Sequence, residues 1–299
     1  MRQNYVECSF SNTDSWLILS SIERSIKQKI ETMGTPLKDW DINIYRGVLT
    51  GYNDAFIIST EKREEILENC QTEEERSKTA ELIRPILRGR DIKRYGYDWN
   101  GLYLIATFPS CHYDIEMFPA IKKHLLTFGD KRLEQTGEIH IINGKKVKAR
   151  KKTNNKWFET QDSISYWEDF FKPKILWKRV GSILRFCYDD NQSLGLDSTC
   201  FATGKNIEYI CCVLNSPMGH YLLKDAPKTG TGDLLVSVQA VEPIKIPIVS
   251  NEQNLKFKEL LTKLLNNNSK ENENEISRMI FDLYNLSHEE RIYVKSNFT

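Results

Sequence analysis

The 299-residue sequence lacks the motifs on which most enzyme classes depend. It contains no GxGxxG or GxxxxGK[ST] loop for a phosphate, no GxSxG and no HExxH. Its seven cysteines show no CxxC spacing, and His112, His124 and His140 have no metal-ligand spacing. We therefore expect no cofactor and no metal, and we interpret the glycine pair in "KTGTGD" as part of a mobile loop.

Long apolar runs are also missing. The longest ones, such as Tyr209–Leu214 and Ile244–Val249, are far too short to cross a bilayer, and the N-terminus has no apolar signal-peptide core. The cysteine count is odd, and Cys211 and Cys212 lie inside an apolar run. We expect a cytoplasmic protein with reduced, buried thiols and no membrane partner.

Charge is balanced overall but unevenly distributed. The net charge of +1 disfavours binding of nucleic acid by bulk charge alone. Acidic residues concentrate at 61–75 and 271–275, whereas basic residues, with aromatic residues among them, concentrate at 84–94, 145–152 and 172–185. This segregation favours a duplex-binding face, because lysine and arginine pair with phosphates and release counterions. The alternative is an ordinary solvated surface with the aromatic residues in the core.

The basic segments supply the candidate DNA contacts. These are Arg88, Arg90, Lys93, Arg94, Lys145, Lys146, Lys148, Arg150, Lys151, Lys152, Lys174, Lys178 and Arg179. If the strand at 172–180 alternates its faces, Lys174 and Lys178 share one face and Arg179 takes the other. Arg88 and Arg90 have a second interpretation, a structural ion pair with Asp91. Lys228 and Thr229 are further candidates, because the backbone N–H groups of their glycine-rich loop can approach a phosphate.

The pair Asn143-Gly144 is the strongest hairpin signal in the chain. It predicts a hairpin over 137–152 whose return strand is basic. A two-stranded ribbon fits the major groove, so we interpret this hairpin, with Asn143 in its turn, as a reader of DNA. A flexible, solvated hairpin is the alternative.

Apolar patterning predicts an α+β fold, with a β-rich mixed-sheet core and flanking N- and C-terminal helices. Helices are expected at 13–33 (capped by Thr13 or Asp14), 61–69, 77–83, 118–133, 208–223, 251–265 and 273–284. Strands are expected within 45–58, 102–107, 137–152, 172–190, 200–204 and 241–249. We expect three segments: N-terminal helical 1–36, recognition domain 37–250 and C-terminal helices 251–299.

The stretch "YRGVLTGYNDAFII" places a glycine-containing loop between two apolar runs. Gly47 and Gly51 supply backbone freedom, and Asn53 and Asp54 tolerate left-handed conformations. The pattern predicts a strand, a structured loop and a second strand.

Five segments in one order resemble the TaqI-like C-terminal specificity domain, which is the target-recognition domain of restriction-modification enzymes and is related to modules of type I specificity subunits. They are "YRGVLTGYNDAFII", "ELIRPILRGRDIKRYGYDWNGLYLI", "KWFETQDSISYWEDFFKPKILWKRV", "YICCVLNSPMGHYLL" and "VEPIKIPIV". The resemblance implies sequence-specific binding of double-stranded DNA beside an adenine methyltransferase or nuclease region. It also implies scaffold roles for Gly47, Thr50, Gly51, Asn53, Ala55, Phe56 and Arg88–Ile92.

The sequence departs from whole enzymes of this kind in one respect. No two prolines are adjacent, so the Asn-Pro-Pro-Tyr motif of an adenine methyltransferase is missing. We therefore expect a non-catalytic chain, either a fragment of a longer enzyme or a stand-alone specificity subunit.

Two other functions stay open from the sequence. In the first, the chain is a docking module that contacts DNA only in a complex with its methyltransferase or nuclease. In the second, the chain is a metal-dependent nuclease. The nuclease would use Asp91 and Lys93 of a D-x-K triplet with an upstream carboxylate from Glu61, Glu64 or Glu81. Such a triplet is more often an ordinary surface ion pair.

Overall fold

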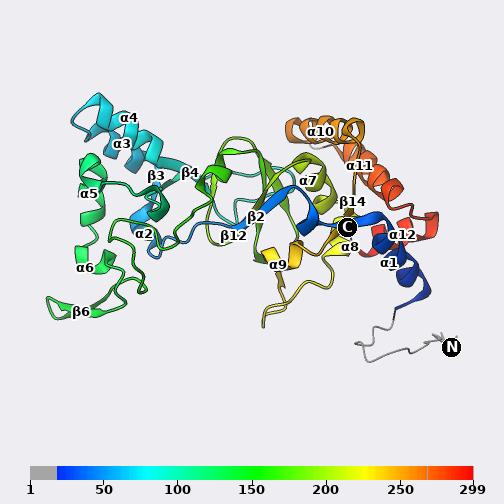
Figure 1. The fold of residues 1–299 in the computed structure, drawn as a ribbon, viewed down its shortest axis with the longest axis horizontal. Coiled ribbons are helices and arrows are strands. Elements are labelled where there is room, and N and C mark those ends of the chain that lie inside the picture. Colours follow the sequence, from blue (N-terminus) through cyan, green and yellow to red (C-terminus); the bar gives the residue numbers. More distant parts are fainter. Residues whose placement is uncertain (1–18, 268, 299) are drawn as a thin grey trace. The chain divides into compact units, whose positions relative to one another are not determined.

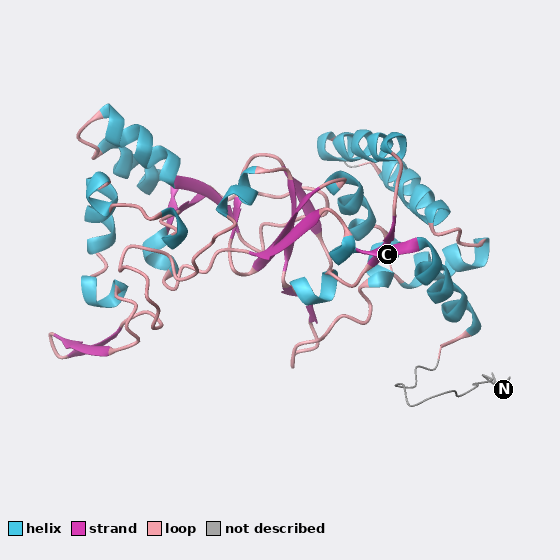
Figure 2. Cartoon of the chain, viewed as in Figure 1, coloured by secondary structure: helices cyan, strands magenta, loops and turns pink. Residues whose placement is uncertain are grey.

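The computed structural model describes residues 19–267 and 269–298. The chain divides into two compact units. The central unit is residues 43–207, and the terminal unit combines residues 1–42 with 208–299. Helices and strands are mixed in both units (Figure 2), so the predicted α+β class is confirmed.

The larger sheet of the central unit has the strand order β10-β8-β12-β2. Its strands are β2 (Ile42–Arg46), β8 (Lys174–Lys178), β10 (Phe186–Asp189) and β12 (Thr199–Gly204). β8 runs antiparallel to both neighbours, with Trp177 opposite Phe186 on one side and Cys200 on the other. β8 and β12 are buried along nearly their whole length, and the middle of each strand is apolar, at Ile175–Trp177 and Cys200–Ala202.

A second sheet has the order β11-β4-β5-β3. Its strands are β3 (Ile57–Ser59), β4 (Ile83–Leu87), β5 (Leu102–Ile105) and β11 (Leu194–Gly195). The helices that accompany it are α2 (Asn53–Phe56), α3 (Thr60–Glu68), α4 (Glu73–Leu82), α5 (Pro119–Leu126) and α6 (Asp130–Leu133). One apolar cluster, including Phe56, Leu104, Phe118 and Leu176, joins both sheets and these helices into a single core.

The other elements of the central unit are short. They are the hairpin β6 (Ile139–Ile142) and β7 (Lys145–Lys148), the strand β9 (Val180–Gly181) and the 3₁₀ helices η2 (Pro109–Cys111), η3 (Ile115–Met117) and η4 (Trp167–Phe171). The hairpin lies at one end of the unit, well separated from β12 (Figure 1). Asn143 and Gly144 both have positive φ, at 51° and 74°, as the predicted two-residue hairpin turn requires.

The terminal unit is mainly helical. Its elements are α1 (Ser21–Met33), β1 (Gly34–Pro36), η1 (Leu37–Asp39), α7 (Ile207–Asn215), α8 (Pro217–Leu222), β13 (Leu234–Leu235), α9 (Val238–Val241), β14 (Lys245–Pro247), α10 (Asn251–Asn266), α11 (Lys270–Leu283) and α12 (His288–Asn297). β1 pairs antiparallel with β14. Within the described ranges 19–267 and 269–298, none of the helices is long and apolar enough to span a bilayer.

Several predicted elements differ in detail. The helix expected at 118–133 is broken at Gly129, whose φ is 86°, and that at 208–223 is broken where Ser216 caps α8 before Pro217. Asn53 and Asp54 begin the short helix α2 instead of adopting left-handed conformations. The helix α12 was not predicted. The expected caps of the first helix, Thr13 and Asp14, lie outside the described residues.

A buried ion pair crosses the larger sheet. Lys174 and Asp189 are directly opposite each other on β8 and β10, and their charged atoms are 2.5 Å apart with both side chains fully buried. The Lys174 ammonium also donates to the Phe170 carbonyl, and Asp189 accepts bonds from Tyr97 and Ser193. Burial lowers the pKa of Lys174, against the opposing effect of Asp189. Lys174 is therefore not available to a phosphate, which corrects its prediction as a DNA contact.

Replacing one partner of this pair is expected to be strongly destabilising. In Asp189→Asn the Lys174 ammonium remains buried without its counter-charge, and we expect the free energy of unfolding to fall by about 3–5 kcal/mol. Urea denaturation of the full chain measures it. Asp190→Asn is the matched control, because Asp190 is exposed. An equal effect of the two substitutions would contradict the structural role of the Lys174–Asp189 pair.

Candidate nucleic-acid interface

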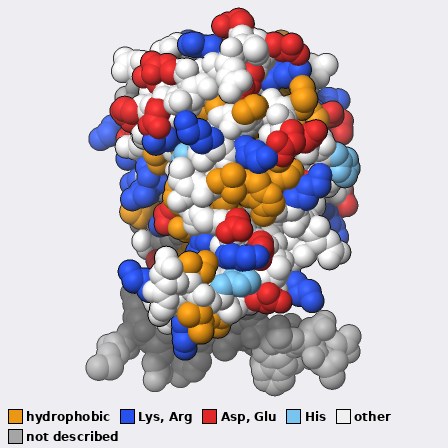
Figure 3. Space-filling view, turned by 90° about the vertical axis from the view of Figure 1, so that its left-hand side faces the viewer, with side chains coloured by type: hydrophobic (Ala, Val, Ile, Leu, Met, Phe, Trp, Pro, Cys, Tyr) orange, Lys and Arg blue, Asp and Glu red, His pale blue; other side chains and the backbone are white. Residues whose placement is uncertain are grey.

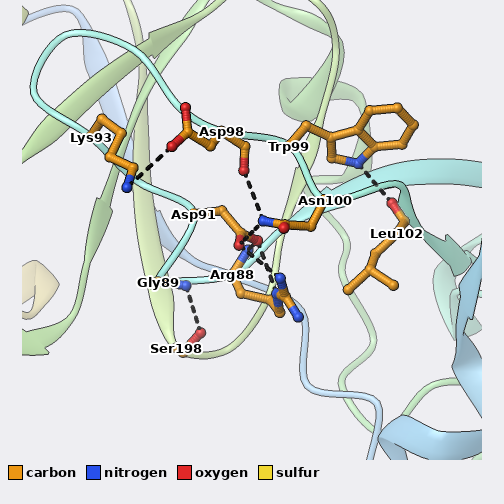
Figure 4. A network of polar contacts seen from close by, with 9 residues as sticks. All are labelled: Arg88, Gly89, Asp91, Lys93, Asp98, Trp99, Asn100, Leu102 and Ser198. Atoms are coloured by element: carbon orange, nitrogen blue, oxygen red, sulfur yellow. Dashed lines mark hydrogen bonds and ion pairs between the residues drawn. The ribbon is translucent and has the colours of Figure 1, made fainter.

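The loop that follows β4 is closed by an ion pair within the "RGRDI" segment (Figure 4). Arg88 donates from Nε and a terminal nitrogen to the two carboxylate oxygens of Asp91, at 2.9 and 2.8 Å. The Arg88 backbone N–H and the Asn100 amide also donate to this carboxylate. These contacts support the structural interpretation of Arg88 given above, in preference to a phosphate contact.

The Asp91 carboxylate therefore holds together the loop that follows β4. Its exposure is 1%. Burial raises its pKa, but the bonds from Arg88 and Asn100 outweigh burial and hold the pKa below its ordinary value. Lys93, the other residue of the D-x-K triplet, forms an ion pair with Asp98 at 3.1 Å. Among residues 19–267 and 269–298, no three or more His, Cys, Asp or Glu side chains are grouped so that they could hold a metal ion.

Two of the three basic segments meet beside this loop. The backbone N–H of Gly89 donates to the Ser198 hydroxyl, and the N–H of Arg179 donates to the Ser198 carbonyl. A β-carbon on Gly89 would lie 2.8 Å from Cγ of Lys178, so glycine is needed for this close approach. The cations gathered here are the loop cluster, namely Arg90, Lys93, Arg94, Lys178 and Arg179. Arg94 lies over the Tyr95 ring, 5.4 Å from its centroid.

The third segment contains a cation with a different role. The guanidinium of Arg150 is buried and donates to four backbone carbonyls, those of Thr50, Leu133, Trp157 and Glu159, at 2.6–3.0 Å. It also lies over the Phe56 ring, 5.0 Å from the centroid. The prediction of Arg150 as a DNA contact is therefore corrected, because its donors join the base of the hairpin to the loop of the "YRGVLTGYNDAFII" stretch.

That loop is shaped to receive Arg150. Gly51 has φ of 77°, a left-handed conformation that favours glycine, and a β-carbon on it would make tight contacts with the side chains of Gln161 and Arg150. The Thr50 hydroxyl donates to the Asn53 amide oxygen at 2.6 Å and accepts the Tyr52 N–H. Gly47 allows a second close approach, because a β-carbon added at this position would lie 2.1 Å from the Leu196 carbonyl oxygen.

The hairpin presents the remaining cations to solvent. Its exposed polar residues, which we name the hairpin cluster, are Asn143, Lys145, Lys146, Lys148, Lys151 and Lys152. Arg132 of α6 supports the return strand, because it donates to the Lys148 carbonyl at 2.5 Å and lies over the Tyr52 ring at 4.2 Å. The hairpin is therefore tied at its base by Arg132 and Arg150.

The two clusters do not form one patch. The hairpin cluster lies at the end of the central unit marked β6, away from the sheet that carries Lys178 (Figure 1). At this end, hydrophobic side chains and Lys or Arg side chains lie next to one another on the surface (Figure 3). Lys228 and Thr229 belong to the terminal unit, where the Thr229 N–H donates to the Asp233 carbonyl and is already used within the loop.

Sequence reasoning missed two features of this surface. Arg132 was absent from the candidates, because its helix gave no signal that it would reach the hairpin. The isoleucines of β6 were also passed over, although Ile139 and Ile141 are 62% and 74% exposed. The signal available in the sequence was the alternation of isoleucine along this strand, at positions 139 and 141.

The Arg88–Asp91 pair predicts a specific pH dependence. Because the folded pKa of Asp91 is depressed, its stabilising contribution is present above the unfolded pKa of about 3.9 and is lost as the pH falls through the folded pKa. Asp91→Asn is thus expected to lower Tm most near pH 7, with the gap narrowing below about pH 4. Thermal unfolding of both proteins from pH 7 to pH 3 measures this. Asp98→Asn, at an exposed pair, is the control. A gap that is constant with pH would contradict the assignment.

Comparison with known proteins places these features in a family. No curated protein sequence matches. The type IIL restriction-modification enzyme MmeI, solved in complex with DNA, has a TM-score of 0.55 and 10% identity, over 89% of this chain and 36% of that one. The type IIG restriction endonuclease BpuSI has a TM-score of 0.47 and 14% identity, over 91% of this chain and 33% of that one. The chain thus spans about a third of each enzyme.

The family model described as "TaqI-like C-terminal specificity domain" matches residues 84–248, which is more than half of the sequence, and the chain belongs to this family.

Proposed function

We propose that this chain binds a short target sequence in double-stranded DNA as the specificity part of a restriction-modification system. The observation that carries the proposal is the family match over 84–248, because this range contains all three basic segments. The fold similarity to MmeI, whose structure was solved with DNA, adds support. Catalysis in this proposal belongs to an adenine methyltransferase or nuclease region outside the chain, and the chain itself holds no cofactor.

The distribution of charge supports contact with phosphates. The net charge is +1, so affinity for DNA has to come from local clusters. Residues 145–152 include five exposed lysines, one buried arginine and no acid, and the loop cluster adds exposed cations at another part of the same unit. We assign the phosphate contacts to these two clusters, and leave Arg88, Arg150 and Lys174 to the scaffold.

The docking function remains the second candidate. It is favoured by apolar side chains exposed on the terminal unit, because Leu255, Leu265 and Ile292 are 58%, 43% and 52% exposed. In this proposal the segments 1–36 and 251–299 contact the methyltransferase or nuclease region, and 37–250 contacts DNA. Binding of DNA by the isolated chain distinguishes the two candidates, since a module that contacts DNA only in a complex will not select a sequence alone.

Neutralising the hairpin is expected to weaken binding to every duplex alike. We predict that the triple variant Lys145→Ala, Lys146→Ala, Lys148→Ala reduces the slope of log K against log salt by about 0.9 for each phosphate that the hairpin no longer neutralises. Fluorescence anisotropy with a duplex recovered by selection from a random pool measures this slope between about 50 and 200 mM salt, a range over which such slopes are resolved.

The matched control removes three lysines from helices of the same unit. It is the variant Lys62→Ala, Lys78→Ala, Lys123→Ala, which changes the net charge equally. We expect its salt slope to equal that of the unmodified chain. Equal slopes for all three proteins would refute the hairpin as a phosphate contact, and the absence of any sequence-selective binding by the unmodified chain would refute the proposed function.

A further inference from the structure

The β6–β7 hairpin has two chemically different faces. Residues opposite each other in an antiparallel pair share a face, and alternate residues of one strand do so too. The register pairs Ile139 with Lys148 and Ile141 with Lys146, so these four side chains form one face, which we call the isoleucine face. The opposite face carries His140, Ile142, Lys145 and Val147.

Burial shows which face is turned to solvent. On the opposite face, His140 and Val147 are partly covered, and the His140 imidazole lies 3.6 Å from the Glu134 carboxylate, whereas Ile142 and Lys145 beside the turn are exposed. On the isoleucine face, Ile139 and Ile141 are 62% and 74% exposed, and Lys146 and Lys148 are exposed beside them. The outward surface of the ribbon therefore combines two branched apolar side chains with two cations.

A merely solvated hairpin does not account for this pattern. Its outward face would carry polar residues, as half-buried antiparallel strands normally do. Ile141 is the most exposed of the large apolar residues of the described chain, and it lies on a segment held at its base by Arg132 and Arg150. Two branched apolar side chains exposed next to each other on one face of a supported element form a small apolar surface that is open to a partner.

The lysines indicate what that surface contacts. Cross-strand neighbours lie about 5 Å apart, so Lys146 and Lys148 flank the isoleucines closely. An apolar protein partner would leave these ammonium groups to be desolvated, whereas a duplex surrounds any apolar contact with phosphates. Within the major groove, the thymine C5-methyl is the apolar group on the base edges, and a two-stranded ribbon is narrow enough to enter.

We propose that Ile139 and Ile141 recognise thymine methyl groups in the major groove, while Lys146 and Lys148 hold the flanking phosphates. This inference rests on the proposed function and deepens it. It makes the two isoleucines determinants of sequence preference and the lysines determinants of affinity. It also assigns the target at least one thymine at the position that the hairpin reaches.

The test removes single methyl groups from the DNA. The duplex recovered by selection from a random pool is compared with versions in which one thymine at a time is replaced by deoxyuridine, which lacks only the C5-methyl. For the unmodified chain we expect affinity to fall about fourfold at one or two positions, the effect of one buried methyl group. For Ile139→Ala or Ile141→Ala we expect thymine and deoxyuridine at the corresponding position to bind equally.

Ile183→Ala provides the matched control. Ile183 is 63% exposed and lies outside the hairpin, so this variant should retain the discrimination of the unmodified chain. Circular dichroism of each variant establishes that it is folded. An exposed isoleucine on the hairpin is not part of the core, so its replacement by alanine is expected to leave the fold intact.

Each other outcome has a definite meaning. If the chain selects a sequence but no deoxyuridine substitution changes affinity, or if the target has no thymine, the inference fails and the proposed function stands. If Ile139→Ala and Ile141→Ala weaken binding to thymine and deoxyuridine duplexes equally, or convert a dimer to a monomer without changing discrimination, the isoleucines have another role and the inference also fails. If no sequence is selected at all, both fail.

Discussion

The guanidinium of Arg150 is the contact on which the arrangement of the central unit depends. It donates to four backbone carbonyls from three segments of the chain, those of Thr50, of Leu133 and of Trp157 and Glu159, and it lies over the Phe56 ring. Burial and the neighbouring Arg132 lower its pKa to about 10, which still leaves it charged at neutral pH. Because carbonyl oxygens and an aromatic face surround it, this charge is accommodated by hydrogen bonds and not by a carboxylate.

The basic residues consequently divide into two classes that the sequence does not distinguish. Arg88, Arg150 and Lys174 hold elements together, through Asp91, backbone carbonyls and Asp189 respectively. The lysines of the hairpin cluster and Arg90, Lys93 and Lys178 of the loop cluster are exposed, where they can meet phosphates, whereas Arg94 and Arg179 are partly buried. A duplex that touches both clusters has to span the central unit, because they lie at separate places on it (Figure 1).

Local signals predicted local structure well. Asn143-Gly144 specifies a turn through its positive φ angles, and Gly51 marks a left-handed position, so both were visible in the sequence. The burial of Lys174 was not visible in the sequence. It depends on the pairing of β8 with β10, which brings Asp189 opposite Lys174. The role of Arg150 likewise depends on carbonyls that are up to 100 positions away in the chain. Alternation puts Lys174 and Lys178 on the same face of β8, yet Lys174 is buried and Lys178 is exposed, so spacing along a strand does not say how deeply each residue is buried.

The central claim is that a supported hairpin, presented by Arg132 and Arg150, contacts the duplex. Amide hydrogen exchange of the full chain, with and without a saturating selected duplex, tests it most directly. The account predicts that DNA slows exchange at the amides of Ile139–Lys148 and at the loop after β4, with little change on α3 and α4. Selective binding that leaves exchange in the hairpin unchanged would contradict it.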